Sequence, residues 1–175
     1  SEKVPHGERH HVCDEACRLT KNITEEFLKK FPQKRWVIDA GSLQAMEADL
    51  IPEGAIVTPN KKEYELLFGS MDTQEAARKY ACTIVRKGPK TLVCGEDNCT
   101  QISNGNAGLT KGGTGDILAG LTVALFAKND AFLSASSASF LVKAAADELY
   151  EKVGTNYNAD DLVQAIPETF RKLAF

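Results

Sequence analysis

The chain has 175 residues, with 21 basic and 24 acidic side chains and a formal net charge of −3. A composition of 43% hydrophobic and 26% charged residues is typical of a globular protein and excludes a disordered or fibrous one. The acidic balance argues against a nucleic-acid-binding protein, and no apolar run approaches the ~18 residues of a membrane span. The length predicts one domain with its own core.

The cysteines predict a reducing compartment. Five of them are present, and no charged-then-apolar leader opens the chain, which together favour a cytoplasmic protein with free thiols. Cys94 and Cys99 flank a short loop and could face each other; two free thiols are favoured over a disulfide. The segment 10–17, His-His-x-Cys-x-x-x-Cys, could bind zinc, but structural zinc usually takes four well-spaced ligands, so a metal there is disfavoured.

The first predicted helix is 22–30, and the residues before it, 1–21, show no periodicity and are expected to be irregular. Asn22 is its predicted N-cap, and Ile23, Phe27 and Leu28 are its predicted apolar face. Pro32 ends it.

Short apolar runs then alternate with helical patterns along the rest of the chain. The predicted strands are 36–38, 56–58, 83–86, 91–94 and 99–102, the last two forming a hairpin. The predicted helices begin near Asn60, Asp72 and Ile117 and cover 131–150 and 158–172. This alternation predicts an α/β layered domain with a mostly parallel sheet.

The segment Lys111-Gly112-Gly113-Thr114-Gly115-Asp116, which precedes the helix at Ile117, is the strongest functional signal. Glycines let a backbone approach a ligand closely, and the free N–H groups at a helix start bind anions. A carboxylate beside a phosphate repels it unless it removes a proton from an attacking hydroxyl, which is the role we predict for Asp116. The alternative is a glycine-rich loop whose acidic first turn only stabilises the helix dipole.

Three further groups lie at the ends of predicted strands, where open α/β sheets keep their ligand sites. Asn60 and Glu63 are three residues apart and could hold hydrated Mg²⁺, or form a capping box, or both. The segment 87–91, Lys-Gly-Pro-Lys-Thr, suits the phosphates or ribose of a nucleotide, although it could be a basic surface turn. Asp39 is either a structural cap or a contact to substrate.

The order of these motifs resembles the ribokinase-like fold and, within it, the ADP/ATP-dependent NAD(P)H-hydrate dehydratases. The segments that carry the resemblance are 37–40, 58–67, 86–91, 104–108 and 112–120, and it extends from Val37 to the last helix. The glycine–aspartate motif is fairly specific to ribokinase-like proteins. The Asn-Gly-Asn-Ala-Gly run at 104–108 favours the dehydratase branch.

The resemblance implies a three-layer α/β/α fold that binds ADP or ATP, with Mg²⁺, and NAD(P)H hydrate. Asp116 would be the catalytic base and would also contact the substrate. Asn60 and Glu63 would line the substrate, and Glu63 would contact a metal through water. The implied nucleotide-binding residues are Lys87, Gly88, Pro89, Lys90, Thr91, Asn106, Gly112, Gly113, Thr114 and Gly115. The implied reaction is phosphorylation of the hydrate followed by elimination, in a homo-oligomer.

The beginning of the chain departs from this family. The family has additional strands and a Gly-Pro-Gly type loop before this region, and segment 1–21 contains no such loop. We therefore expect residues 1–175 to be the C-terminal portion of a single domain, incomplete or covered by a partner chain. Two alternatives are a ribokinase-like kinase for a sugar or vitamin precursor and a non-catalytic nucleotide-binding domain.

Overall fold

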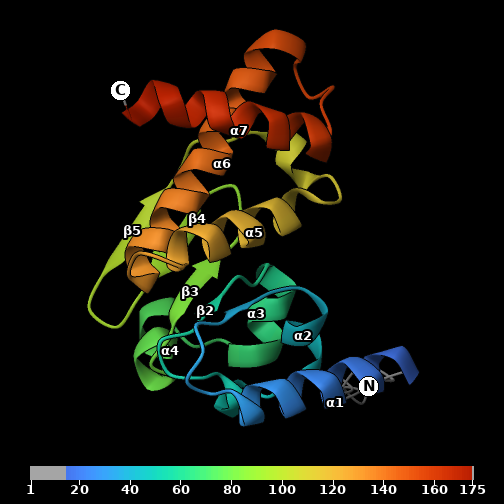
Figure 1. Cartoon of the computed structure of the whole chain (residues 1–175), viewed down its shortest axis with the longest axis vertical. Helices are drawn as coiled ribbons and strands as arrows, with labels where there is room; N and C mark the ends of the chain where they lie inside the picture. The colour runs from blue at the N-terminus through green and yellow to red at the C-terminus, as the bar shows by residue number, and fades with distance from the viewer. Residues whose placement is uncertain (1–14, 175) are drawn as a thin grey trace, which may run out of the picture.

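The structure, a computed structural model, describes residues 15–174 (Figure 1). Its helices are α1 (Glu15–Lys30), α2 (Gly41–Ala45), α3 (Lys61–Phe68), α4 (Thr73–Lys79), α5 (Thr114–Phe126), α6 (Ala131–Val153) and α7 (Ala159–Ala174). Its strands are β1 (Val37–Ile38), β2 (Ile56–Val57), β3 (Thr83–Arg86), β4 (Thr91–Cys94) and β5 (Cys99–Ile102). Among the helices of this described part, none combines the length and apolarity needed to cross a membrane.

The five strands form one sheet in the order of the chain, β1-β2-β3-β4-β5. The first three are parallel, and α2, α3 and α4 make the crossovers between them. β4 is antiparallel to both of its neighbours, so β5 runs in the same direction as the first three strands. This agrees with the predicted mostly parallel sheet, and the hairpin lies where it was predicted.

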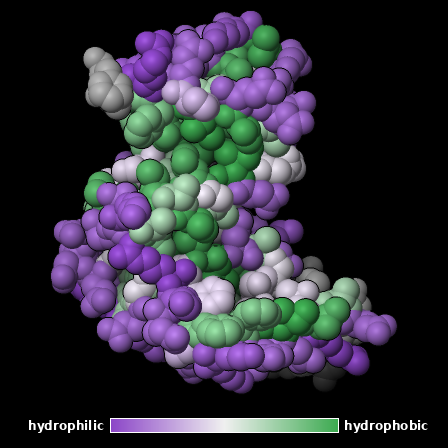
Figure 2. All heavy atoms as spheres, in the orientation of Figure 1, coloured by the Kyte–Doolittle hydropathy of each residue, from purple (hydrophilic) through white to green (hydrophobic). Residues whose placement is uncertain are grey.

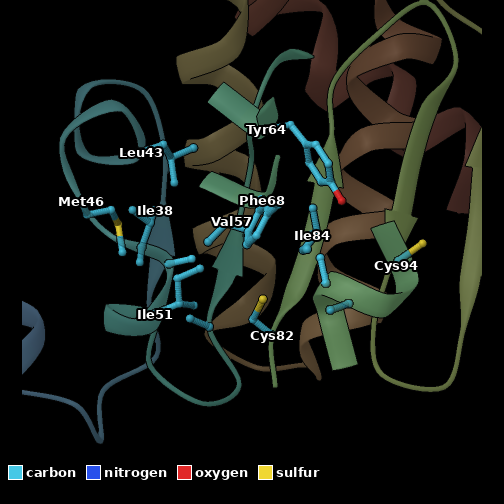
Figure 3. Packing of buried hydrophobic residues seen from close by; sticks show 14 of the residues in the cluster. Ile38, Leu43, Met46, Ile51, Val57, Tyr64, Phe68, Cys82, Ile84 and Cys94 are labelled. Atoms are coloured by element: carbon cyan, nitrogen blue, oxygen red, sulfur yellow. The ribbon is translucent and has the colours of Figure 1, made fainter. Parts of the chain in front are cut away.

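The helices cover the two faces of the sheet in two groups, so the predicted three-layer arrangement is confirmed. Figure 1 shows α1–α4 on one side and α5–α7 on the other. Neighbouring strand residues divide between the two cores because side chains alternate along a strand. Val57, Ile84 and Cys94 belong to the core on the side of α1–α4, and Figure 3 shows them with Leu43 of α2 and Phe68 of α3. Ile56, Val85 and Val93 pack with α5–α7 in a second core that also contains several buried alanines.

The first helix differs from its prediction at both its start and its buried face. It begins at Glu15, so Asn22 lies inside it and is not its cap, and 15–21 is helical rather than irregular. Leu28 is buried as expected, but Ile23 and Phe27 are 46% and 51% exposed. Thr24 is buried instead, where its Oγ1 hydrogen-bonds to Ser42 Oγ of α2 at 3.0 Å.

The prediction of two free thiols at Cys94 and Cys99 is wrong. These residues are direct cross-strand partners in the β4–β5 hairpin, with their Cα atoms 4.2 Å apart, and they form a disulfide. Cys82 is a free thiol in the core; burial raises its pKa to about 12. Most of the 10–17 segment lies outside the described residues, and within 15–174 no cluster of three metal-ligating side chains is found.

Candidate active site

A cavity of about 760 Å³ lies between the loop that follows β3, the loops that follow β5 and the start of α5. Most of the predicted nucleotide-binding residues wall it, namely Lys87, Gly88, Pro89, Lys90, Thr91, Asn106, Thr114 and Gly115, together with Asn60 from the predicted substrate site. Gly112, Gly113, Glu63 and Asp116 are not among the lining residues. Three motifs far apart in the sequence therefore meet around one space, although their roles as ligand contacts stay predictions.

The glycine-rich loop turns into α5 through a left-handed residue. Gly113, the N-cap, has φ of +87°, and a Cβ there would come within 2.9 Å of the Ala159 Cβ. The Thr114 hydroxyl donates to the carbonyls of Leu109, at 2.7 Å, and Lys111, at 2.9 Å. These bonds fix the loop at the start of α5, whose Thr114 and Gly115 line the cavity, and the first turn of a helix favours an anion.

An ion pair lies directly beneath this helix start. Lys87 Nζ, after β3, is 2.7 Å from Asp39 Oδ1, after β1. Asp39, which the sequence predicts to be a structural cap or a substrate contact, is thus paired with a lysine. A Cβ placed on Gly115 would lie 3.5 Å from the Lys87 Nζ. Asp116 follows Gly115 and is exposed in the first turn of α5, where an acidic side chain is favoured by the helix dipole.

The capping box predicted for Asn60 and Glu63 is present. Asn60 Oδ1 accepts from the N–H groups of Lys62 and Glu63, and Glu63 Oε2 accepts from the Asn60 N–H at 2.8 Å. Glu63 Oε1 accepts from Gln44 Nε2, and the side chain is only 4% exposed. Glu63 thus orients Asn60 at the cavity wall, and its contact to a metal stays a prediction.

The side chain of Asn106 makes every hydrogen bond that an amide can make. Its Oδ1 accepts from Gly108 N and from Tyr157 Oη, and its Nδ2 donates to the Ala146 carbonyl and to Asp147 Oδ1. Burial raises the pKa of Tyr157, which keeps its hydroxyl protonated as the donor. Asn106 therefore shapes the loop through its side chain, which leaves its backbone as the part that can face a ligand.

Sequence reasoning did not find three residues that build these walls: Lys143, Asp147 and Tyr157. Lys143 lines the cavity, and Lys111 from the glycine-rich loop donates to the carbonyls of Thr155 and Tyr157. A signal was present, because Lys143 and Asp147 are charged residues one turn apart in an otherwise uncharged stretch of the helix, 131–147. Such charges in a buried helix are retained when they have polar partners.

Comparison with known proteins finds a matching family and several similar proteins. Residues 15–168 match the family described as NAD(P)H-hydrate dehydratase. The chain is 41% identical over 150 residues to the bifunctional NAD(P)H-hydrate repair enzyme Nnr of Archaeoglobus fulgidus, covering 85% of this chain and 31% of that protein.

Solved structures agree on the fold. The ADP/ATP-dependent NAD(P)H-hydrate dehydratase of Bacillus subtilis, co-crystallised with ATP/Mg²⁺ and soaked with CoA, superposes with a TM-score of 0.67 at 26% identity, covering 79% of this chain and 56% of that one. A ribokinase-like superfamily protein of Enterococcus faecalis gives a TM-score of 0.76 at 23% identity, over 87% of this chain and 58% of that one. The chain thus spans a third or less of the bifunctional relative and little more than half of these structures. With a ribokinase-like fold and a family match over nearly all of its described residues, the chain belongs to the NAD(P)H-hydrate dehydratase family.

Proposed function

We propose that this chain carries the nucleotide site and the catalytic carboxylate of an ADP- or ATP-dependent dehydratase that returns NAD(P)H hydrate to NAD(P)H in the cytoplasm. The observation that carries the proposal is the cavity in which the loop 87–91, the loop of Asn106 and the start of α5 meet. The ammonium of Lys87 and the N–H groups of α5 suit a polyphosphate, and Asp116 follows Gly115 in the first turn of the same helix.

The proposed reaction makes a poor leaving group into a good one. The hydroxyl oxygen of the hydrate forms a bond to the terminal phosphorus of the nucleotide, its proton passes to the Asp116 carboxylate, and the bond from that phosphorus to its bridging oxygen breaks. The electron pair of the ring nitrogen then expels phosphate from the adjacent carbon. Loss of a proton from the next ring carbon restores the double bond of NAD(P)H. Phosphoryl transfer depends chiefly on positioning and charge neutralisation, which the cavity walls supply.

Magnesium fits this site as a companion of the phosphates, whose charge it neutralises when bound. Each Glu63 carboxylate oxygen accepts one hydrogen bond and keeps a free lone pair, which suits a water-mediated contact better than direct ligation. We propose this water-mediated role for Glu63, with Asn60 lining the bound substrate.

The test is the substitution Asp116→Asn in the full-length protein. The amide keeps the shape of the carboxylate but cannot take the hydroxyl proton, so we expect recovery of NAD(P)H absorbance to fall by about 10²-fold or more. Binding of ADP, measured by calorimetry, should change little. Near-normal turnover of the Asp116→Asn variant would refute the catalytic assignment.

Product analysis separates the dehydratase from a small-molecule kinase. A dehydratase releases inorganic phosphate and NAD(P)H in equal amounts, whereas a kinase accumulates a phosphorylated acceptor. The family match at 15–168 favours the first outcome.

A further inference from the structure

Helix α6 carries two charged residues one turn apart on the side that faces the cavity loops. Lys143 and Asp147 contact different loops, and both are distant in the sequence from the predicted motifs that they contact. The residues around them on α6 are buried and mostly small, including Ser139, Ala145 and Ala146. A lysine that is 6% exposed in such a helix needs a specific set of partners to stay there.

The ammonium of Lys143 joins two separate pieces of the cavity wall. Its Nζ donates to the carbonyls of Pro89 at 2.8 Å, Ile102 at 3.2 Å and Gly88 at 3.3 Å. Gly88 and Pro89 belong to the loop after β3, and Ile102 ends β5. An ammonium has three N–H donors, so these acceptors occupy all of them and leave none for a ligand. Lys143 can therefore act on a nucleotide only through the backbone that it holds.

Asp147 holds the opposite wall. Its Oδ2 accepts from Gly105 N at 2.8 Å, and its Oδ1 accepts from Asn106 Nδ2 at 3.0 Å. The same loop rests on the stem of Lys143, because a Cβ on Gly105 would lie 2.9 Å from the Lys143 Cγ. One helix thus positions both loops that the nucleotide would have to contact.

We propose that Lys143 and Asp147 are positioning residues for the nucleotide, which set the separation between the Gly88–Pro89 loop and the Gly105–Asn106 loop. The proposal rests on the proposed function, in that the cavity is taken to bind ADP or ATP. It gives α6 a role in nucleotide affinity that none of the sequence motifs predicted.

The experiment measures the dissociation constants of ADP and of ATP for Lys143→Met by calorimetry, at a temperature where each variant is folded. Methionine keeps most of the apolar stem but removes the three donors, so the loop after β3 loses its tether. We expect both dissociation constants to rise about tenfold or more, since hydrogen bonds from a charged group are among the stronger ones.

Two substitutions on the same helix serve as controls. Lys152→Met removes an exposed charge, and Leu141→Ala truncates a buried side chain that lies outside the residues lining the cavity. Both should leave the dissociation constants at the wild-type value, even where Leu141→Ala lowers the melting temperature. A Lys143→Met protein that binds ADP as tightly as wild type would overturn the proposal, as would a Leu141→Ala protein that loses affinity equally.

If Lys143→Met does not fold, the dissociation constant of ADP is measured for Asp147→Asn instead. The side-chain amide of asparagine has one oxygen in place of two, so it can accept from Gly105 N or from Asn106 Nδ2 but not from both. We therefore expect about a fivefold weaker binding of ADP. Unchanged affinity would overturn the proposal. A wild-type protein that binds neither ADP nor ATP would instead refute the proposed function itself, so the two failures are distinct.

Discussion

Gly115, in the first turn of α5, lies next to the Lys87–Asp39 ion pair. A Cβ there would make only ordinary contacts, the nearest at 3.5 Å to Lys87 Nζ, so the fold does not itself require glycine at this position. The same side chain would extend over the free N–H groups where phosphates would bind.

We therefore expect Gly115→Val to abolish the thermal protection given by ADP or ATP with Mg²⁺, while the melting temperature without nucleotide changes little. Gly120→Val is the control, because Gly120 lies in the same helix with nothing within 4 Å of its Cβ position. Gly113→Val should also lose protection, but its positive φ makes it destabilising as well. Equal protection in wild type and Gly115→Val would locate the nucleotide elsewhere.

Gly108 allows the loop of Asn106 to lie against the ring of Tyr157. A Cβ at Gly108 would come within 2.3 Å of the ring, and the ring cannot move away without losing its hydrogen bond to Asn106. We expect Gly108→Ala to lower the free energy of unfolding by about 1–3 kcal/mol, measured by urea denaturation. Gly112→Ala, in the same loop and with nothing within 4 Å, should change it by much less. Equal losses would mean that the Tyr157 contact is not what requires glycine.

At the scale of elements, the β4–β5 hairpin is closed by the Cys94–Cys99 disulfide. The two cysteines are five residues apart, and the chain-entropy estimate for so short a loop is about 2 kcal/mol. Reduction with dithiothreitol should therefore lower the free energy of unfolding by about that amount. Because Cys17 is also disulfide-bonded, Cys99→Ser should still respond to reduction, but its loss of stability should be smaller than that of the wild type by this amount. An unchanged stability of the wild type on reduction would mean that the hairpin is held by its other contacts.

Elements whose signals are local were predictable from the sequence. The caps at Asn60, Asp72 and Asn158 formed as expected, because each side chain bonds to backbone only two or three residues away. The face of α1 was not predictable, since it depends on a bond between Thr24 and Ser42 of another helix.

The same distinction, between local signals and contacts made only in the folded chain, holds at the candidate active site. The motifs around Lys87 and Gly115 could be recognised because each lies within a few residues of chain. Lys143, Asp147 and Tyr157 act on loops roughly forty to fifty residues away in the sequence, and only the folded chain brings them there.

At the scale of the whole molecule, several apolar surfaces have no partner among the described residues. Leu19, Ile23 and Phe27 form an exposed row on α1, and Figure 2 shows apolar surface along this helix. A hollow of about 330 Å³ between α5, α6 and α7 is walled by apolar side chains, including Phe140 and Phe170. Beyond β1, no described strand pairs with the free edge of the sheet. Such surfaces are usually covered in proteins.

We therefore expect a protein made of these 175 residues alone to self-associate. Light scattering should give a mass well above the 19.0 kDa of one chain. The double substitution Ile23→Lys and Phe27→Lys, on the exposed row of α1, should lower the apparent mass if that row forms part of the interface between copies. A monodisperse particle of about 19 kDa with cooperative unfolding would contradict this expectation.

The division of the helices between the two faces of the sheet has a consequence during translation. Residues 15–102 contain every described strand and the helices α1–α4, so one face of the sheet can be covered before the rest of the chain has emerged from the ribosome. The opposite face, with Ile56, Val85 and Val93, stays bare until α5 and α6 have been synthesised. Exposed apolar surface of this kind is what general chaperones bind, and the interval between strand β5 and helix α6 is when a nascent chain of this protein would most need one.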